Sequence, residues 1–204
     1  MPIIVDNISQ GSPEWDALRA GNPGASSISK IITNKGEPSK QRDDYMRQLA
    51  GELIVGQCEK TFQSIHMENG LEREENARSL FELIHDMEVR KVALVYKDEQ
   101  RKFHVSPDGL IGDHAGIEIK NPMMKTHVKY LLDQKLPSDY FSQVQMSLYV
   151  CEREFWYFMS NYISLPPFII KVERDDAFIA KLKTELDVFC FDLVATVKKL
   201  KELA

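Results

Sequence analysis

SPDGLIGDHAGIEIK, residues 106–120, decides the fold of this chain because it joins two apolar runs through a turn-rich segment. In a β-strand, residues two positions apart share a face, so Glu118 and Lys120 point one way while the neighbouring isoleucines point the other. Asp108 lies where the preceding strand ends, and GLIGDHAG can fold the chain back so that the Asp108 carboxylate approaches Glu118. The sequence therefore predicts that two carboxylates and one ammonium group meet at one place.

This arrangement is typical of a divalent metal site. Two carboxylates this close repel each other unless a cation lies between them. Mg²⁺ prefers oxygen ligands and is normally held by one or two carboxylates together with substrate phosphate. Lys120 beside the ion could orient or help deprotonate the attacking water and balance charge on phosphorus, which indicates metal-assisted phosphodiester hydrolysis. The alternative is an ordinary amphipathic strand with Glu118 and Lys120 solvated and PDG as a common turn.

The surrounding segments predict a mixed α/β fold. Helical spacing or capping signals mark residues 12–21, 26–32, 42–55, 67–85, 124–134, 139–151 and 175–200. Strand patterns mark residues 88–96, 102–108, 116–122, 154–162 and 168–174. The first three of these strands predict an antiparallel meander. Because helices precede and flank the strands, we expect a mixed sheet with the meander near its centre and helices packed around it.

The length and composition of the chain limit the kinds of protein it can be. The 204 residues are 43% hydrophobic and 28% charged, which suits a single domain spanning residues 1–204. No apolar run approaches a membrane span and MPIIVDNISQ lacks an export signal, so we expect a cytoplasmic protein. Cys58, Cys151 and Cys190 are far apart with no CxxC spacing, which argues against a disulfide framework or a zinc site. The net charge of −5 disfavours bulk attraction to nucleic acid but allows a local basic groove.

Glu74 is a third acidic candidate, on the helix predicted at residues 67–85. It falls within an apolar stripe formed by Leu71, Ala77, Phe81 and Ile84. An unpaired carboxylate that faces a core is costly, so Glu74 should meet a cation or a donor. The alternative is an ion pair with Arg78, four residues along the same helix.

QVQMSLY, residues 143–149, offers polar groups on a helix. Gln145 and Tyr149 are four apart and share one helical face, where an amide and a hydroxyl could fix a water or a phosphate oxygen. Gln143 lies on a different face, and the spacing leaves open which glutamine turns inward. A polar helix flank is the alternative interpretation.

Five stretches together resemble a known family: SPDG, GIEIKNP, ENGLEREENARSLFE, YFSQVQMSLYV and EFWYF. They are similar to the phage lambda-type exonucleases, the YqaJ-like viral recombinase group of the PD-(D/E)xK nuclease superfamily. The resemblance runs from EWDALRAGNPGASSISKII to beyond KVERDD. It implies a restriction-endonuclease-like core and a Mg²⁺-dependent 5′-to-3′ exonuclease on double-stranded DNA. It also implies a homotrimeric ring that leaves 3′ overhangs for a single-strand annealing protein, encoded by a phage or prophage in a bacterial host.

The resemblance assigns catalytic roles to residues of the opening stretch. Asp108 and Glu118 correspond to the metal-binding carboxylates, the backbone carbonyl of Ile119 to a further metal ligand, and Lys120 to the catalytic lysine. It implies two Mg²⁺ ions, with Mn²⁺ as an accepted substitute, and the number acting at once stays open. Glu74 corresponds to an upstream acidic position.

Other positions follow from the same resemblance. Gln143 or Gln145, with Tyr149, corresponds to a glutamine motif beside the metals. Arg19 and Ser26 correspond to a pocket for a terminal 5′ phosphate, and a guanidinium fork and a helix N-terminus both bind phosphate well. The alternative is that Ser26 only caps a helix and Arg19 is solvated. The basic residues expected to face DNA are Lys35, Lys40, Arg42, Lys125 and Lys129.

Two other functions stay open. One is an endonuclease or junction resolvase of the same superfamily. The other is a non-catalytic clamp that binds DNA ends, which the presence of Asp108, Glu118 and Lys120 together argues against.

Overall fold

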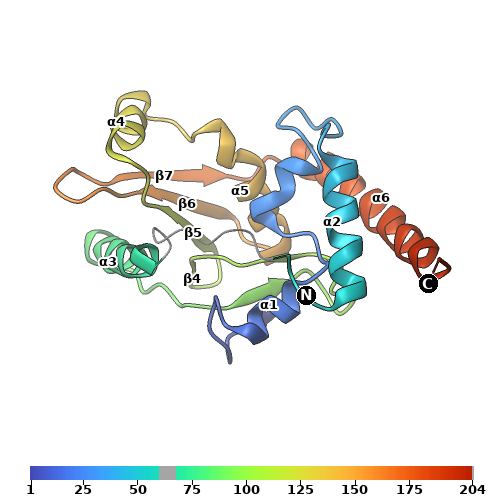
Figure 1. Cartoon of the computed structure of the whole chain (residues 1–204). Coiled ribbons are helices and arrows are strands. Elements are labelled where there is room, and N and C mark those ends of the chain that lie inside the picture. Colours follow the sequence, from blue (N-terminus) through green and yellow to red (C-terminus); the bar gives the residue numbers. More distant parts are fainter. Residues whose placement is uncertain (60–67, 204) are drawn as a thin grey trace.

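The computed structural model describes residues 1–59 and 68–203, in which helices surround two β-sheets (Figure 1). The helices are α1 (Pro13–Arg19), the 3₁₀ helix η1 (Ala25–Lys30), α2 (Arg42–Val55), α3 (Glu68–His85), α4 (Met124–Asp133), α5 (Ser138–Cys151) and α6 (Asp176–Lys201). The strands are β1 (Ile3–Val5), β2 (Leu94–Tyr96), β3 (His104–Val105), β4 (Gly109–Ile111), β5 (Ala115–Lys120), β6 (Phe155–Ser160) and β7 (Phe168–Glu173). No helix in this part of the chain is long and apolar enough to cross a membrane.

The strands form one antiparallel sheet and one mixed sheet. The first has the order β1-β2-β3, and the second has the order β4-β5-β6-β7. Within the second sheet only β5 and β6 are parallel, because α4 and α5 form the connection between them. The two sheets meet where Arg90 and Leu110 exchange backbone hydrogen bonds of 2.8 and 2.9 Å. The predicted mixed α/β class, with antiparallel strands flanked by helices, is confirmed.

The predicted three-stranded meander, however, is divided between the two sheets. Residues 102–108 supply only β3, which pairs with β2 and ends at Val105, two residues before Pro107, a residue that lacks a backbone donor. β5 pairs instead with β4, which comes from the segment that the sequence favours as a turn. Leu110 and Ile111 are buried there, at 2% and 9% exposure, so this short apolar run gains more as a strand than as a turn. The turn itself shrinks to residues 112–114, with Gly112 at a φ of +49°.

The second predicted helix is also shorter than the sequence suggests. η1 ends at Lys30 because the chain then forms a small hairpin, in which Thr33 N donates to Glu37 O at 2.8 Å and Ser39 N donates to Ile31 O at 2.9 Å. The other predicted helices match those observed within one or two residues at their ends. Ser12 is the N-cap of α1 and accepts a hydrogen bond from Trp15 N, and in α6 the N-cap Asp175 accepts one from Phe178 N.

The two faces of β5 are covered by different helices, with α3 on one side and α4 and α5 on the other (Figure 1). Ile117 and Ile119 pack with Phe81 of α3 in one buried cluster. Glu118 pairs in register with Phe158 of β6, whose ring packs in a second cluster beneath α4. Glu118 therefore lies in a buried layer between the sheet and α5, which is where the functional groups gather.

Candidate active site

Three of the predicted side chains meet at the end of β5. Asp108 Oδ2 accepts a hydrogen bond of 2.6 Å from the backbone N–H of Ile119. Lys120 Nζ forms an ion pair with Glu118 Oε1. Glu118 is almost fully buried, at 2% exposure, whereas 30% of the Lys120 side chain is exposed. The period-two alternation along β5 produces this convergence, because Glu118 and Lys120 share a face.

The two carboxylates of this group repel each other, and this repulsion changes the pKa values of the group. Burial and the neighbouring Glu118 carboxylate raise the pKa of Asp108 well above its ordinary value, although Lys120 and the Ile119 N–H act against this. Burial alone lowers the pKa of Lys120, but Glu118 and Asp108 outweigh burial and raise that pKa above its ordinary value. A divalent cation between the carboxylates would relieve their repulsion.

The available donors suit a hard cation. Because the N–H and C=O of one residue point to the same edge of a strand, the Ile119 carbonyl lies on the Asp108 side of β5. No group of three or more His, Cys, Asp or Glu side chains in the described residues could hold a metal ion. The protein would therefore offer two carboxylates and one carbonyl, an all-oxygen set of the kind that Mg²⁺ completes with water and substrate phosphate.

The structure separates the two glutamines of α5. Gln143 Nε2 donates to Glu118 Oε1 at 2.6 Å, so Gln143 lies in the carboxylate group. Gln145 points elsewhere, donating to Glu173 O at 3.0 Å and accepting from Asp175 N at 2.8 Å. Gln145 therefore joins the end of β7 to the start of α6.

Tyr149 shares the helical face of Gln145, as the spacing predicts, and this face is turned away from the carboxylates. Its ring stacks on Phe103 at 6.1 Å and lies 5.0 Å from Lys97 Nζ. The structure thus does not bring Gln145 or Tyr149 to the group formed by Asp108, Glu118 and Lys120. The i, i+4 relation identified a real shared face but could not say which buried layer it faces.

Glu74 lies at the other edge of the group and is paired. Arg78 Nη2 donates to Glu74 Oε1 at 2.5 Å, which is the alternative that the i, i+4 spacing left open. Arg78 Nε also donates to the backbone carbonyl of Asp108 at 3.1 Å. Ile84 is 50% exposed and Arg78 only 5%, so α3 is rotated relative to the predicted stripe. The side chain of Leu71 lies outside the described residues.

Arg78 is therefore a site residue, which the sequence pattern indicated only as an ion-pair partner of Glu74. It bridges Glu74 and the Asp108 backbone, and also donates to Glu75 at 2.7 Å. The sequence signal for Arg78 was its position four residues after Glu74, the spacing of an ion pair on a helix. A cavity of about 360 Å³ opens on this side of the group, lined in part by Glu74, Arg78, Lys91 and Asp108.

Arg19 lies in a second polar group, on the β3 side of the molecule. Its guanidinium carbon lies 3.7 Å from the centre of the Trp15 ring, and its Nε donates to His104 Nε2 at 3.3 Å. No carboxylate within residues 1–59 and 68–203 forms an ion pair with Arg19. Ser26 is exposed at the start of η1, and no hydrogen bond in that part of the chain joins it to Arg19. No local pattern in the sequence indicated His104, which approaches Arg19 only through the tertiary fold.

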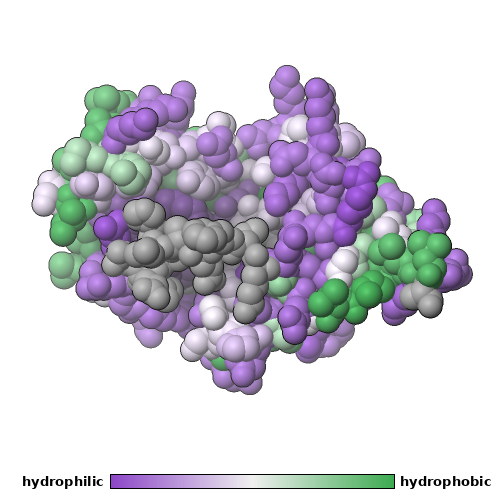
Figure 2. Space-filling view, viewed as in Figure 1, coloured by the Kyte–Doolittle hydropathy of each residue, from purple (hydrophilic) through white to green (hydrophobic). Residues whose placement is uncertain are grey.

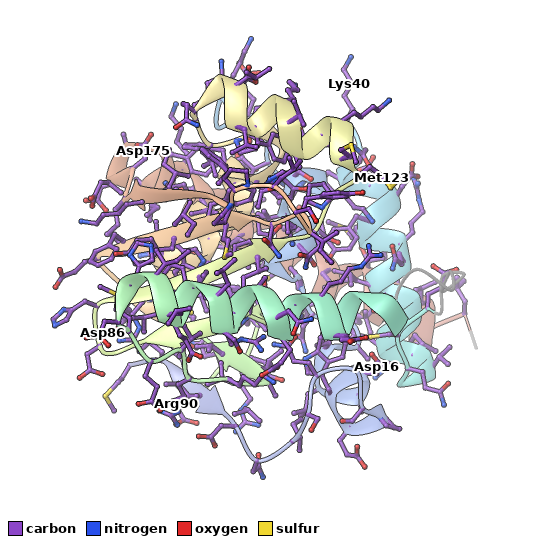
Figure 3. The ribbon with its side chains drawn as sticks, turned by 90° about the vertical axis from the view of Figure 1, so that its left-hand side faces the viewer. Asp16, Lys40, Asp86, Arg90, Met123 and Asp175 are labelled. Carbon is purple, nitrogen blue, oxygen red and sulfur yellow. The ribbon has the colours of Figure 1, made fainter. Side chains whose placement is uncertain are left out.

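The basic residues expected to face DNA fall into two groups. Arg42 is engaged between helices, with Nη1 at 2.5 Å from Glu185 Oε2 of α6, and so is not free for DNA. Lys35, Lys40, Lys125 and Lys129 are exposed. Figure 3 shows Lys40 and Met123, which precedes α4, both to the upper right and above α3 in that view.

The burial of His104 predicts how the free energy of unfolding should change with pH. Burial, with a smaller contribution from Arg19, lowers its pKa to about 3. Unfolded histidine binds a proton below about pH 6.5, so protonation favours the unfolded state as the pH falls, by about 2 kcal/mol at pH 5. The groups that face the ring are the Arg19 guanidinium and the Tyr96 ring, 6.4 Å away. Denaturant unfolding at pH 8 and pH 5 should show a smaller acid loss for His104→Gln than for the parent chain, and equal losses would contradict the neutral, buried state.

Comparison with solved structures first defines the class of the fold. The structure of this chain closely matches that of an alkaline exonuclease (LHK-Exo) from Laribacter hongkongensis. The TM-score is 0.84 and the sequence identity is 32%, over 94% of this chain and 97% of that chain. The same enzyme in complex with dAMP matches equally well. A phage related exonuclease from Haemophilus somnus 129PT matches with a TM-score of 0.68 over 90% of this chain and 96% of that chain, and at 14% identity shows the fold alone.

The family follows from a second comparison. Residues 14–154 match the YqaJ-like viral recombinase domain. No curated protein matches the chain. The chain therefore belongs to the YqaJ-like viral recombinase family, of the lambda-exonuclease type.

Proposed function

We propose that this protein is a Mg²⁺-dependent exonuclease that removes nucleotides from the 5′ end of one strand of double-stranded DNA. The observation that carries the proposal is the convergence of Asp108, Glu118 and Lys120 at the end of β5. The match of this chain to an alkaline exonuclease over nearly its whole length also supports phosphodiester hydrolysis from a DNA end. The solved complex of that relative with dAMP is consistent with a site that accommodates a single nucleotide.

Each side chain of the group has a distinct task in hydrolysis. Asp108, Glu118 and the Ile119 carbonyl would hold the metal, which when bound polarises the phosphate and makes a water molecule more acidic. Lys120, as an ammonium group beside Glu118, can donate to the attacking water or to a phosphate oxygen and balance its developing charge. Gln143 fixes the orientation of the buried Glu118 carboxylate through its 2.6 Å hydrogen bond.

Arg19 accounts for the choice of the 5′ end. A half-buried guanidinium with no carboxylate partner in the described residues is suited to a terminal phosphate, which carries more negative charge than an internal one. Ser26 would supply a hydroxyl donor. Arg19 contacts His104, which lies on β3 four residues before Asp108. The segment from β3 to Asp108 therefore connects the proposed phosphate site to the carboxylates.

Arg19→Ala should reduce the preference for 5′-phosphorylated over 5′-hydroxyl duplex ends by about 10-fold to 100-fold, the effect of losing a hydrogen bond to a charged group. The measurement is kcat/KM on two duplexes that differ only in that phosphate. Arg47→Ala is the matched control, because Arg47 is exposed and forms an ion pair with Asp44 on the same helix. An unchanged preference in Arg19→Ala would remove Arg19 from the phosphate site.

The assembly proposed is a ring of three identical copies. Figure 2 shows apolar residues gathered at separate ends of the visible face, over α4 and near the ends of α2 and α6. At the start of α4 and within it, Met123 is 76% exposed and Leu132 79%, and on α6 Phe191 is 75% exposed and Val194 68%. Two different apolar surfaces on one chain suit a head-to-tail contact, which closes into a ring when the rotation allows. Light scattering should give three times the chain mass for the parent and a smaller mass for Phe191→Asp, and a monomeric parent chain would contradict the ring.

The biological setting completes the proposal. A 5′-to-3′ exonuclease leaves a 3′ single strand, which a strand-annealing protein can take up during recombination. The family name, viral recombinase, supports this role and a phage or prophage origin in a bacterial cytoplasm. An enclosing ring can stay on DNA with fewer basic contacts than an open binder, which agrees with the net charge of −5.

The function is tested with linear duplex DNA labelled at one 5′ end or one 3′ end, incubated with Mg²⁺ or EDTA. We expect release of the 5′ label first, a surviving 3′ strand, and no reaction with EDTA. A closed circular plasmid should stay intact. Cutting of the circle would instead support an endonuclease or resolvase, and binding without release of either label would support a non-catalytic clamp.

A further inference from the structure

The contact between Arg19 and His104 has a defined direction. An arginine Nε always carries a proton, so at 3.3 Å His104 Nε2 must be the acceptor. The imidazole proton then lies on Nδ1, which is buried and has no hydrogen-bond partner in the described residues. A buried donor without a partner is rare and calls for a reason. Here the reason is that the Nε2 lone pair is committed to Arg19.

The surroundings of His104 are shaped to allow this contact. Gly24 forms a backbone bridge with His104, and a Cβ at Gly24 would lie 2.8 Å from His104 Nε2. Glycine therefore leaves the space through which the ring edge reaches Arg19. On the other side, Trp15 stacks on the guanidinium and is itself fixed by donating from Nε1 to Ala93 O at 2.9 Å.

The chemical identity of the acceptor matters as well. A carboxylate at this place would hold Arg19 equally well but would neutralise its charge and compete with an incoming phosphate. A neutral imidazole fixes Nε and the plane of the fork while the full positive charge remains. The two terminal nitrogens of Arg19 then keep their N–H groups for an anion. Burial and the adjacent guanidinium lower the pKa of His104 to about 3, so the ring stays neutral across the working range.

We propose that His104 is a positioning residue that orients the Arg19 guanidinium, with Trp15 stacked against its face, for the terminal 5′ phosphate of the DNA substrate. The inference rests on the proposed role of Arg19 in binding that phosphate. It adds a specificity-determining contact that acts through Arg19 and does not touch the reacting atoms.

The test compares two neutral amides at one position. Glutamine can place an amide oxygen near the position of imidazole Nε2, whereas asparagine is one methylene shorter and cannot reach Arg19. We expect His104→Gln to keep the 5′-phosphate preference within roughly twofold of the parent chain and His104→Asn to lower it by about tenfold. The loss should lie mainly in KM for phosphorylated ends, and kcat/KM should fall much less on 5′-hydroxyl ends. Gly24→Ala, which pushes on the ring without removing it, should lower the preference as His104→Asn does.

The outcomes separate this inference from the function on which it rests. If Arg19→Ala lowers the preference but His104→Asn and Gly24→Ala do not, His104 is not a positioning residue and the phosphate role of Arg19 stands. If Arg19→Ala itself leaves the preference unchanged, the phosphate site is wrong and the inference falls with it. If the His104 variants slow both kinds of end equally, or if glutamine behaves like asparagine, His104 has only a packing role and the inference is overturned.

Discussion

Lys120→Ala is expected to slow DNA hydrolysis by about 100-fold to 10,000-fold, the range for losing a positioned proton donor or acceptor in the transition state. DNA binding should persist, because the carboxylates, Gln143 and Arg19 remain in place. The loss should therefore be in kcat, with the dissociation constant for a duplex end measured in Ca²⁺ nearly unchanged. Single-turnover cleavage and fluorescence anisotropy give the two quantities.

The chain supplies a matched control for this substitution. Lys171 on β7 pairs with Glu173 at 2.9 Å, two residues along the same strand, which is the spacing of Lys120 and Glu118 on β5. Lys171→Ala removes the same kind of ion pair from an exposed position and should leave the rate unaltered. Cleavage by Lys120→Ala within a few fold of the parent chain would show that the ammonium group has no part in the reaction.

Asp108→Asn should weaken Mg²⁺ binding by about 100-fold or more and reduce the rate in parallel, since even a residue that only supports a metal ligand changes affinity by about 10-fold to 100-fold. The asparagine oxygen can still accept from the Ile119 N–H, so the fold around β5 should survive. Isothermal calorimetry with Mg²⁺ or Mn²⁺ measures the affinity directly.

Asp113→Asn is the control for charge. Asp113 lies in the turn between β4 and β5 with its side chain 99% exposed, so the same loss of one negative charge falls outside the site. Its metal affinity and rate should equal those of the parent chain. Equal metal binding by Asp108→Asn and the parent would mean that Asp108 is not a ligand.

Local periodicity predicted much of this molecule. The alternation of GIEIK placed Glu118 and Lys120 on one face, and Asp108 lies beside β5 as predicted, although the segment between them contains strand β4 as well as a turn. The helices at residues 42–55 and 139–151 follow from apolar spacing, which depends only on near neighbours. Features of this kind are decided within a few residues and can be seen in the sequence.

Features set by contacts between distant segments could not be seen in the same way. Spacing could not choose between Gln143 and Gln145, because the choice depends on how α5 is rotated against β5, 25 residues away along the chain. The contact of Arg19 with His104 spans 85 residues. The pairing of β5 with β4 also could not be predicted, because the burial of Leu110 favours a strand where the local residues favour a turn. A single domain and the number of metal ions stay predictions.

We propose above all that Asp108 and Glu118 enclose a divalent cation that can hold a DNA phosphate. The most direct measurement is anomalous X-ray scattering from crystals grown with Mn²⁺ and a 5′-phosphorylated duplex. We expect a peak between the two carboxylates, with metal–oxygen distances of about 2.0–2.2 Å that include the Ile119 carbonyl. Crystals that contain Mn²⁺ and bound DNA but no peak between Asp108 and Glu118 would contradict the account.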